Sequence, residues 1–228
     1  MSAAVSVAAV ILAAGSSSRM GGIKKEYQKI NINNDSITVL GSSVRAFASN
    51  PCVQVIVIAI PKNDEAAARN ALPSEYLQSK KLQIFFVDGG NTRSASVYNA
   101  LSSLKSYNPD YVLIHDGARP WVSTELIQNI INAAVKHNAV IPLLPITDTP
   151  KECGEGIIKR HLKRANVGIA QTPQGFNFMQ ILDAHKKAAM EQEEFTDDAE
   201  IWGRFCGDVF YIPGELQNKK ITFKEDLN

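Results

Sequence analysis

The chain has 228 residues, of which 45% are hydrophobic and 21% charged, with a formal net charge of +1. This length and apolar content suit one α/β domain over residues 1–228 with a full hydrophobic core. The nearly neutral charge excludes a global field that would draw the protein to nucleic acid or to a membrane surface, so any anion site must be local.

The cysteines Cys52, Cys153 and Cys206 are far apart and lack metal-ligand spacing, which fits free thiols in a reducing compartment. The N-terminal apolar run has no Lys or Arg before it and leads straight into a glycine loop, so we interpret it as a buried strand and not as a signal peptide. No other apolar run approaches the roughly 20 residues that span a bilayer. We therefore expect a cytoplasmic protein.

The first informative stretch is Val7–Lys25, an apolar run that ends at Gly15 and continues into a loop of small residues with Arg19 and Lys25. Its spacing fits neither a P-loop nor the Gly-x-Gly-x-x-Gly dinucleotide fingerprint. Small residues let backbone N–H groups approach an anion, and the basic side chains add positive charge. The loop therefore predicts a polyphosphate site, with Lys24 interpreted as a solvated surface lysine.

The next segments alternate between helical and extended patterns. We expect helices over Ser36–Ser49, Lys62–Lys81, the segment after Ser96, and Ser123–His137, and strands over Val53–Ile60, Leu82–Val87 and Tyr111–Ile114. This alternation predicts a right-handed, doubly wound and mostly parallel sheet whose ligand loops gather at one edge.

A second loop, Asp88–Ser96, follows the third strand and contains a double glycine. Its backbone and Ser96 could recognise a nucleobase, because glycines admit a flat ring close to the chain. Routine capping of a helix explains Thr92 but not the double glycine. For Arg93, a phosphate and solvent remain equal alternatives.

A third loop, His115–Pro120, places a carboxylate and a guanidinium in one turn. Asp116 could bind magnesium or a hydroxyl group, or it could simply pair with Arg119. We interpret His115 as structural, because a nucleophile that is already a phosphate anion needs no general base.

From Pro142 to Gly175, prolines interrupt any long helix, and the segment is too long for an ordinary connection. Beyond it we expect helices over Asn177–Glu193 and after Thr196, then strands over Asp208–Ile212 and Lys219–Phe223. The acidic pair after Thr196 is explained by helix capping alone, and Lys219 and Lys220 by protection of an exposed edge.

Seven motifs now stand in order: LAAGSSSRMG with Lys25, DGGNTRSASV, IHDGARP, PITDTPK, QTPQGF, TDDA and NKKIT. Over nearly the whole chain they resemble the 2-C-methyl-D-erythritol 4-phosphate cytidylyltransferase family of the non-mevalonate isoprenoid route. The resemblance implies a Rossmann-like nucleotidyltransferase fold that joins CTP to a polyol phosphate with Mg²⁺ or another divalent cation. It also implies a homodimer formed through a protruding arm at about 142–175.

The resemblance further implies site residues, which fall into four groups. Those that would hold the nucleotide are Ala13, Ala14, Gly15, Gly89, Gly90, Asn91, Ser96, Asp116 and Gly117. Those that would be catalytic are Arg19, Lys25 and Lys220. Those that would bind the acceptor are Asp116, Arg119, Thr172 and Thr196, with Thr149 and Arg164 reaching the neighbouring subunit. Asp116 is the possible metal ligand, beside phosphate oxygens.

Two departures from the family pattern concern individual residues. The family often has Pro-Lys-Gln where this chain has Lys24-Lys25-Glu26, so Lys25 is the best alignment for the loop lysine. An acidic residue often stands where this chain has Asn91, which weakens the assignment of Asn91 to base recognition.

Three rival functions remain. A ribitol 5-phosphate cytidylyltransferase would share the loops and differ only in its acceptor. A nicotinamide-dependent oxidoreductase is disfavoured because the second strand ends in Ile60-Pro61-Lys62, without an acidic residue for a ribose. A nucleotide sensor would bind CTP without releasing pyrophosphate.

Overall fold

The structure is a computed structural model that describes residues 5–17, 20–32, 34–191 and 194–227. The strands of its main sheet are β1 (Val7–Leu12), β4 (Val53–Ile60), β5 (Gln83–Asp88), β6 (Tyr111–Asp116), β7 (Ala139–Pro145), β10 (Gly168–Ala170), β11 (Gln174–Asn177) and β12 (Phe210–Pro213). Within the described residues they form one sheet in the order β10-β7-β11-β6-β1-β4-β5, with β12 beside β7. β1 is parallel to β4 and β6, whereas β11 is antiparallel to β6. The predicted α/β fold with a mostly parallel sheet is confirmed.

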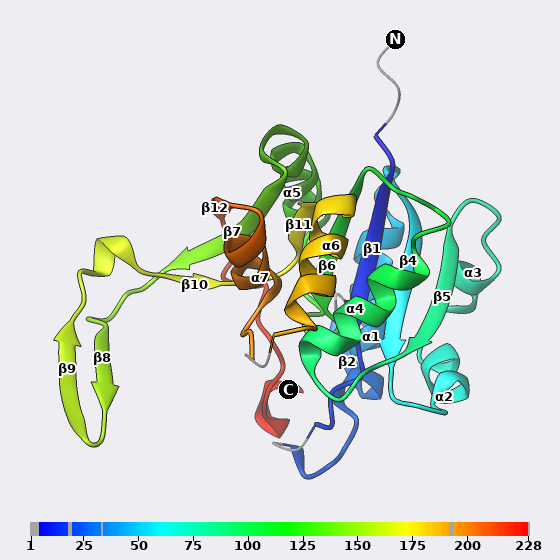
Figure 1. Ribbon diagram of the computed structural model, residues 1–228. Helices are drawn as coiled ribbons and strands as arrows, with labels where there is room; N and C mark the ends of the chain where they lie inside the picture. The colour runs from blue at the N-terminus through cyan, green and yellow to red at the C-terminus, as the bar shows by residue number, and fades with distance from the viewer. Residues whose placement is uncertain (1–4, 18–19, 33, 192–193, 228) are drawn as a thin grey trace.

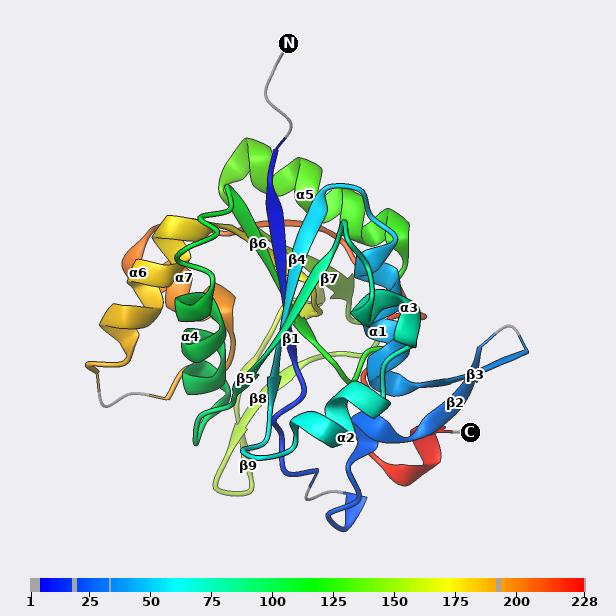
Figure 2. The ribbon, with the colours of Figure 1, turned by 90° about the vertical axis from the view of Figure 1, so that its right-hand side faces the viewer.

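Helices cover both faces of this sheet (Figures 1 and 2). One face carries α4 (Arg93–Ser103), α6 (Phe178–Ala188) and α7 (Asp198–Phe205), and the other carries α1 (Val39–Ala48) and α5 (Thr124–His137). Successive residues of β1 point to opposite faces: Val10 packs in the cluster that contains Val97 of α4, and Ile11 in the cluster that contains Phe47 of α1. The apolar run of β1 is therefore the centre of a two-sided core.

Three predicted helices have different bounds in the structure. The helix expected over Asn177–Glu193 is α6, which ends at Ala188. The helix expected over Ser36–Ser49 begins only at Val39, because β2 (Lys29–Ile32) and β3 (Asp35–Thr38) form a hairpin before it and Thr38 caps the helix. The helix expected over Lys62–Lys81 is two short helices, α2 (Glu65–Asn70) and α3 (Ser74–Leu77). Pro73 lies between them, where it cannot donate the backbone hydrogen bond that a continuous helix needs.

The strand expected over Lys219–Phe223 is wrong, because this segment is irregular and follows the cavity described below. The N–H of Ile221 donates to the carbonyl of Ala118, and the Ile221 side chain is fully buried. The segment is thus attached to the loop after β6 by single contacts and not by a strand ladder. It leads to the short 3-10 helix η4 (Lys224–Leu227).

The segment predicted as an arm at 142–175 contributes both ends to the main sheet, since β7 runs to Pro145 and β10 pairs with it. Between them, β8 (Lys151–Gly154) and β9 (Ile157–His161) form an antiparallel hairpin, followed by the 3-10 helix η3 (Arg164–Asn166). This hairpin, which we call the arm, stands away from the sheet and its helices (Figure 1). Among the described residues, no helix combines the length and the apolar character needed to cross a bilayer.

Candidate active site

A cavity of about 460 Å³ lies at the carboxyl ends of β1 and β6. Its lining combines the three loops singled out in the sequence with the C-terminal segment. The predicted site residues that line it are Ala14, Gly15, Lys25, Gly90, Asn91, Ser96, Asp116 and Lys220. The parallel sheet therefore gathers at one edge the loops that are far apart in sequence.

Gly89 lets the first two loops touch, and Gly90 lets the second loop fold against the start of α4. A Cβ atom at Gly89 would lie 2.3 Å from the Cβ of Ala14, and one at Gly90 would lie 2.4 Å from the Cβ of Ala95. The Ser96 hydroxyl accepts a hydrogen bond from the Gly90 N–H at 3.0 Å. The glycines are thus explained by close backbone approach, which the capping of α4 by Thr92 does not require.

The first loop turns back on itself through its lysines. Lys25 begins the 3-10 helix η2 (Lys25–Tyr27) and is only 9% exposed, although it lines the cavity. The prediction that Lys24 is a solvated surface lysine is wrong: its Nζ donates to the Gly15 carbonyl at 2.7 Å, and burial lowers its pKa. Lys24 therefore ties the end of the loop to its start. The other predicted cation of this loop, Arg19, lies outside the described residues.

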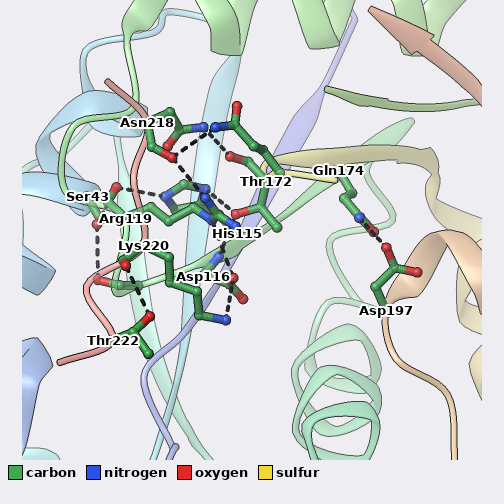
Figure 3. Close-up of polar contacts among 12 residues, drawn as sticks. Ser43, His115, Asp116, Arg119, Thr172, Gln174, Asp197, Asn218, Lys220 and Thr222 are labelled. Atoms are coloured by element: carbon green, nitrogen blue, oxygen red, sulfur yellow. Dashed lines mark hydrogen bonds and ion pairs between the residues drawn. The ribbon is translucent and has the colours of Figure 1, made fainter. Parts of the chain in front are cut away.

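Asp116 lies among three cations, Lys220, Arg119 and Arg93, of which Figure 3 shows the first two. Its Oδ2 is 2.8 Å from Nζ of Lys220 and 3.5 Å from Nε of Arg119, and its Oδ1 is 3.7 Å from Nε of Arg93. Burial alone would raise the pKa of Asp116, but Lys220, Arg93 and Arg119 outweigh it and hold the pKa well below its ordinary value. The carboxylate is therefore ionised and brings Lys220 to the cavity wall.

The other predicted site residues that the structure describes are absent from the cavity lining. Ala13, Gly89, Gly117 and Arg119 lie next to residues that line it. Thr172 is 5% exposed, and its hydroxyl accepts from the Asp116 N–H at 3.0 Å. Thr196 lies just before α7, where its hydroxyl donates to Glu200 at 2.8 Å. Thr149 and Arg164 lie around the arm, where Arg164 donates to the Thr147 carbonyl at 2.6 Å.

Several lining residues were missing from the sequence-based set, namely Leu12, Ser16, Ser17, Glu26, Thr92, Arg93, Ala118 and Thr222. Most of them are sequence neighbours of predicted residues, so their position beside a motif could have identified them as lining residues. Arg93 is the informative one, because its guanidinium lies between two carboxylates, an outcome that neither of the two alternatives considered for it foresaw.

The cavity offers little to a metal ion before a ligand binds. Its acidic lining residues are Glu26 and Asp116. Glu26 is paired with Lys24 at 3.7 Å, and Asp116 lies among cations. The described part of the chain contains no group of three His, Cys, Asp or Glu side chains that could hold a metal. The residues present therefore do not form a metal cage of their own.

Comparison with known proteins gives consistent matches. The family model described as 2-C-methyl-D-erythritol 4-phosphate cytidylyltransferase matches residues 7–228. The chain is 37% identical over 228 residues to the "Bifunctional enzyme IspD/IspF" of Bartonella tribocorum, covering 98% of this chain and 55% of that protein, so it spans about half the length of this relative. It is 35% identical over 218 residues to the 2-C-methyl-D-erythritol 4-phosphate cytidylyltransferase of Bacillus cereus, covering 96% of this chain and 93% of that protein.

Among solved structures, the crystal structure of 4-diphosphocytidyl-2C-methyl-D-erythritol synthase from Anaerococcus prevotii superposes with a TM-score of 0.83 at 29% identity. The match covers 98% of this chain and 93% of that one. Sequence motifs, fold and comparisons agree, and the chain belongs to the 2-C-methyl-D-erythritol 4-phosphate cytidylyltransferase family.

Proposed function

We propose that the protein transfers the cytidylyl group of CTP to 2-C-methyl-D-erythritol 4-phosphate and releases pyrophosphate, a step of isoprenoid precursor synthesis. One observation carries the proposal: a single cavity combines a glycine-lined loop, the buried Lys25 and the pair of Asp116 with Lys220. Family membership supports the identity of both substrates. The unpaired state of all three cysteines supports a reducing compartment, the cytoplasm.

In the proposed reaction, a phosphate oxygen of the acceptor attacks the α-phosphorus of CTP in line. A new P–O bond forms as the bond to pyrophosphate breaks, and the electron pair leaves with pyrophosphate. The nucleophile is already an anion, so the chain need not remove a proton. Lys25 and Lys220 would stabilise the negative charge that builds on the equatorial oxygens, and the loops would hold the two phosphates in line.

Magnesium, or another divalent cation, would enter as part of the nucleotide substrate. Phosphate oxygens are preferred magnesium ligands, and the cavity brings few carboxylates of its own. Asp116, which lines the cavity, is the candidate protein ligand. Removing the cation with a chelator should abolish turnover, and addition of Mg²⁺ should restore it.

We also propose that the protein is a homodimer in which the arm of one subunit reaches the cavity of the other. Ile157 and Ile158 of the arm are 58% and 53% exposed, an apolar surface that a partner would cover. Thr149 and Arg164 would then contact the acceptor bound to the neighbouring subunit.

The deciding experiment measures pyrophosphate release for CTP, UTP, ATP and GTP, each with 2-C-methyl-D-erythritol 4-phosphate and with ribitol 5-phosphate. We expect release only with CTP and the methylerythritol acceptor, with the CDP-linked polyol identified by mass spectrometry. Turnover with ribitol 5-phosphate instead would favour the rival acceptor. CTP binding without pyrophosphate release from any acceptor would favour a nucleotide sensor.

A further inference from the structure

Arg93 connects the cavity to the packing of two helices behind it. It is the first residue of α4, whose N-terminus is capped by Thr92. Its Nη2 lies 2.7 Å from Oδ2 of Asp198, and its Nε lies 3.7 Å from Oδ1 of Asp116. One guanidinium thus faces a carboxylate of α7 with one nitrogen and a carboxylate of the cavity wall with another, a geometry that a lysine cannot reproduce.

The α7 side of this connection is firmly held. Asp198 is completely buried, and its second oxygen, Oδ1, accepts from Nε2 of His185 on α6 at 3.1 Å. Burial alone would raise the pKa of Asp198, but Arg93 and His185 keep it below its ordinary value. Asp198 is therefore an ionised, fully enclosed anchor. Because α6 and α7 pack on the sheet, Arg93 has a fixed support behind it.

On the cavity side, the two oxygens of Asp116 have different partners. Oδ1 faces Arg93, and Oδ2 faces Lys220 and Arg119. A partial rotation of the carboxylate about its Cβ–Cγ bond would move Oδ2 away from Lys220, which extends from an irregular segment and is 38% exposed. Arg93 opposes this rotation because it attracts Oδ1, the other oxygen of the same carboxylate.

We propose that Arg93, anchored by Asp198 and His185, is a positioning residue for cytidylyl transfer: it orients Asp116 so that Lys220 stays at the cavity wall. The inference rests on the proposed function and deepens it. The competing interpretation is that Arg93 binds a phosphate directly, since it lines the cavity and is 29% exposed. Its two carboxylate partners argue against that role, because a phosphate would have to compete with both of them.

The test compares Arg93→Lys, which keeps the charge but not the fork, with the paired variant Arg93→Gln/Asp198→Asn. The pair removes the arginine and the buried charge together, so that no uncompensated carboxylate is left inside the protein. Arg204→Gln is the matched control, since Arg204 also belongs to the α6–α7 region and pairs with Glu191 at 3.6 Å, away from the cavity. We expect kcat to fall about 10- to 100-fold in both test variants, with the Kd for CTP within about twofold of wild type and the control unchanged.

The same substitutions are then repeated with Lys220→Ala in single-turnover assays. If Arg93 acts through Lys220, then Arg93→Lys should change the rate by less than about twofold once Lys220 is gone. An equal loss with and without Lys220, or a raised Kd for CTP at normal kcat, overturns the proposal. Normal kcat in the folded Arg93 variants overturns it too. Failure of the wild-type protein to release pyrophosphate would instead refute the proposed function.

Discussion

The Thr172 hydroxyl and Nδ1 of His115 lie 3.0 Å apart in the protein interior, although they are 57 positions apart in the chain. The same hydroxyl accepts from the Asp116 N–H, and Nε2 of His115 lies 3.2 Å from the Arg119 carbonyl. A carbonyl can only accept, so Nε2 carries the proton and Nδ1 accepts from Thr172. This neutral imidazole joins β6, the loop after it and the segment before β11, next to Asp116.

His115 should make the protein less stable in mild acid. Burial lowers the pKa of His115 from 6.5 to about 4. The unfolded chain therefore takes up the proton first as the pH falls, so the stabilising contribution is complete above about pH 6.5 and is lost between there and about pH 4. We expect the free energy of unfolding to drop by on the order of 3 kcal/mol over this range because of this group.

Urea unfolding at several pH values measures that drop. His115→Gln keeps a donor and an acceptor in place but does not titrate, so its unfolding free energy should change less between pH 7 and pH 4. His161→Gln, on the exposed arm, is the control and should behave as wild type. If the unfolding free energies of His115→Gln and of the wild type fall equally between pH 7 and pH 4, the prediction is contradicted.

Lys25 should be needed for turnover more than for folding or CTP binding. Replacing a donor that faces developing transition-state charge costs on the order of 3 kcal/mol, so Lys25→Ala should lower kcat roughly a hundredfold or more. Calorimetric titration measures the affinity for CTP, and thermal unfolding measures stability; both should stay close to wild type. Lys25→Met is a second variant that preserves the buried apolar stem of the side chain. Lys29→Ala, on the exposed face of β2, should be silent. Near-normal turnover of Lys25→Ala would exclude its catalytic role.

The local patterns predicted the centre of the sheet well, because strands buried on both faces have continuous apolar sequences, as in β1 and β4. Because the loops that follow parallel strands meet at one edge of the sheet, the sequence also predicted that Lys25, Gly90 and Asp116 lie together. The structure brings all three to one cavity. Long-range pairing was not readable in this way. The contacts of Arg93 with Asp198 and of Lys220 with Asp116 span 105 and 104 residues, respectively, and no local periodicity encodes them.

Gly89 should be replaceable only with damage to the cavity. The Cβ of Gly89→Ala would lie 2.3 Å from the Cβ of Ala14, which forces the first and second loops apart. Such overpacking costs about 1–3 kcal/mol of stability, and the displaced loops should also raise the KM for CTP. Denaturant unfolding and steady-state kinetics measure the two effects.

Two matched variants control for the nature of the Gly89 substitution. Ala14→Gly/Gly89→Ala removes the methyl group that is struck and should recover part of the lost stability. Gly203→Ala, in α7, meets no atom within 4 Å and should stabilise the protein by up to about 1 kcal/mol. A Gly89→Ala protein as stable as wild type would show that the loops adapt without cost.

The proposed exchange of arms predicts recovery of activity from two impaired variants. Lys25→Ala damages the body of a subunit, and Arg164→Ala damages η3 beside its arm, so each homodimer should turn over poorly when the acceptor concentration is well below its KM. In a mixed dimer, one cavity would combine the intact Lys25 of one subunit with the intact Arg164 of the other. Random pairing of equal amounts makes half of the dimers mixed, each with one working site, so about a quarter of wild-type activity should return.

Co-expression of the two variants with different affinity tags, followed by purification of the mixture and of the doubly tagged dimer, measures this recovery. The control pairs Lys25→Ala with Lys220→Ala: both substitutions damage the body, so neither cavity of the mixed dimer is intact and no activity should return. If the first mixture stays inactive while its dimers form, the arm does not complete the neighbour's site. If Arg164→Ala alone is fully active, Arg164 does not bind the acceptor, because loss of a charge-assisted phosphate contact would weaken acceptor binding at least several-fold.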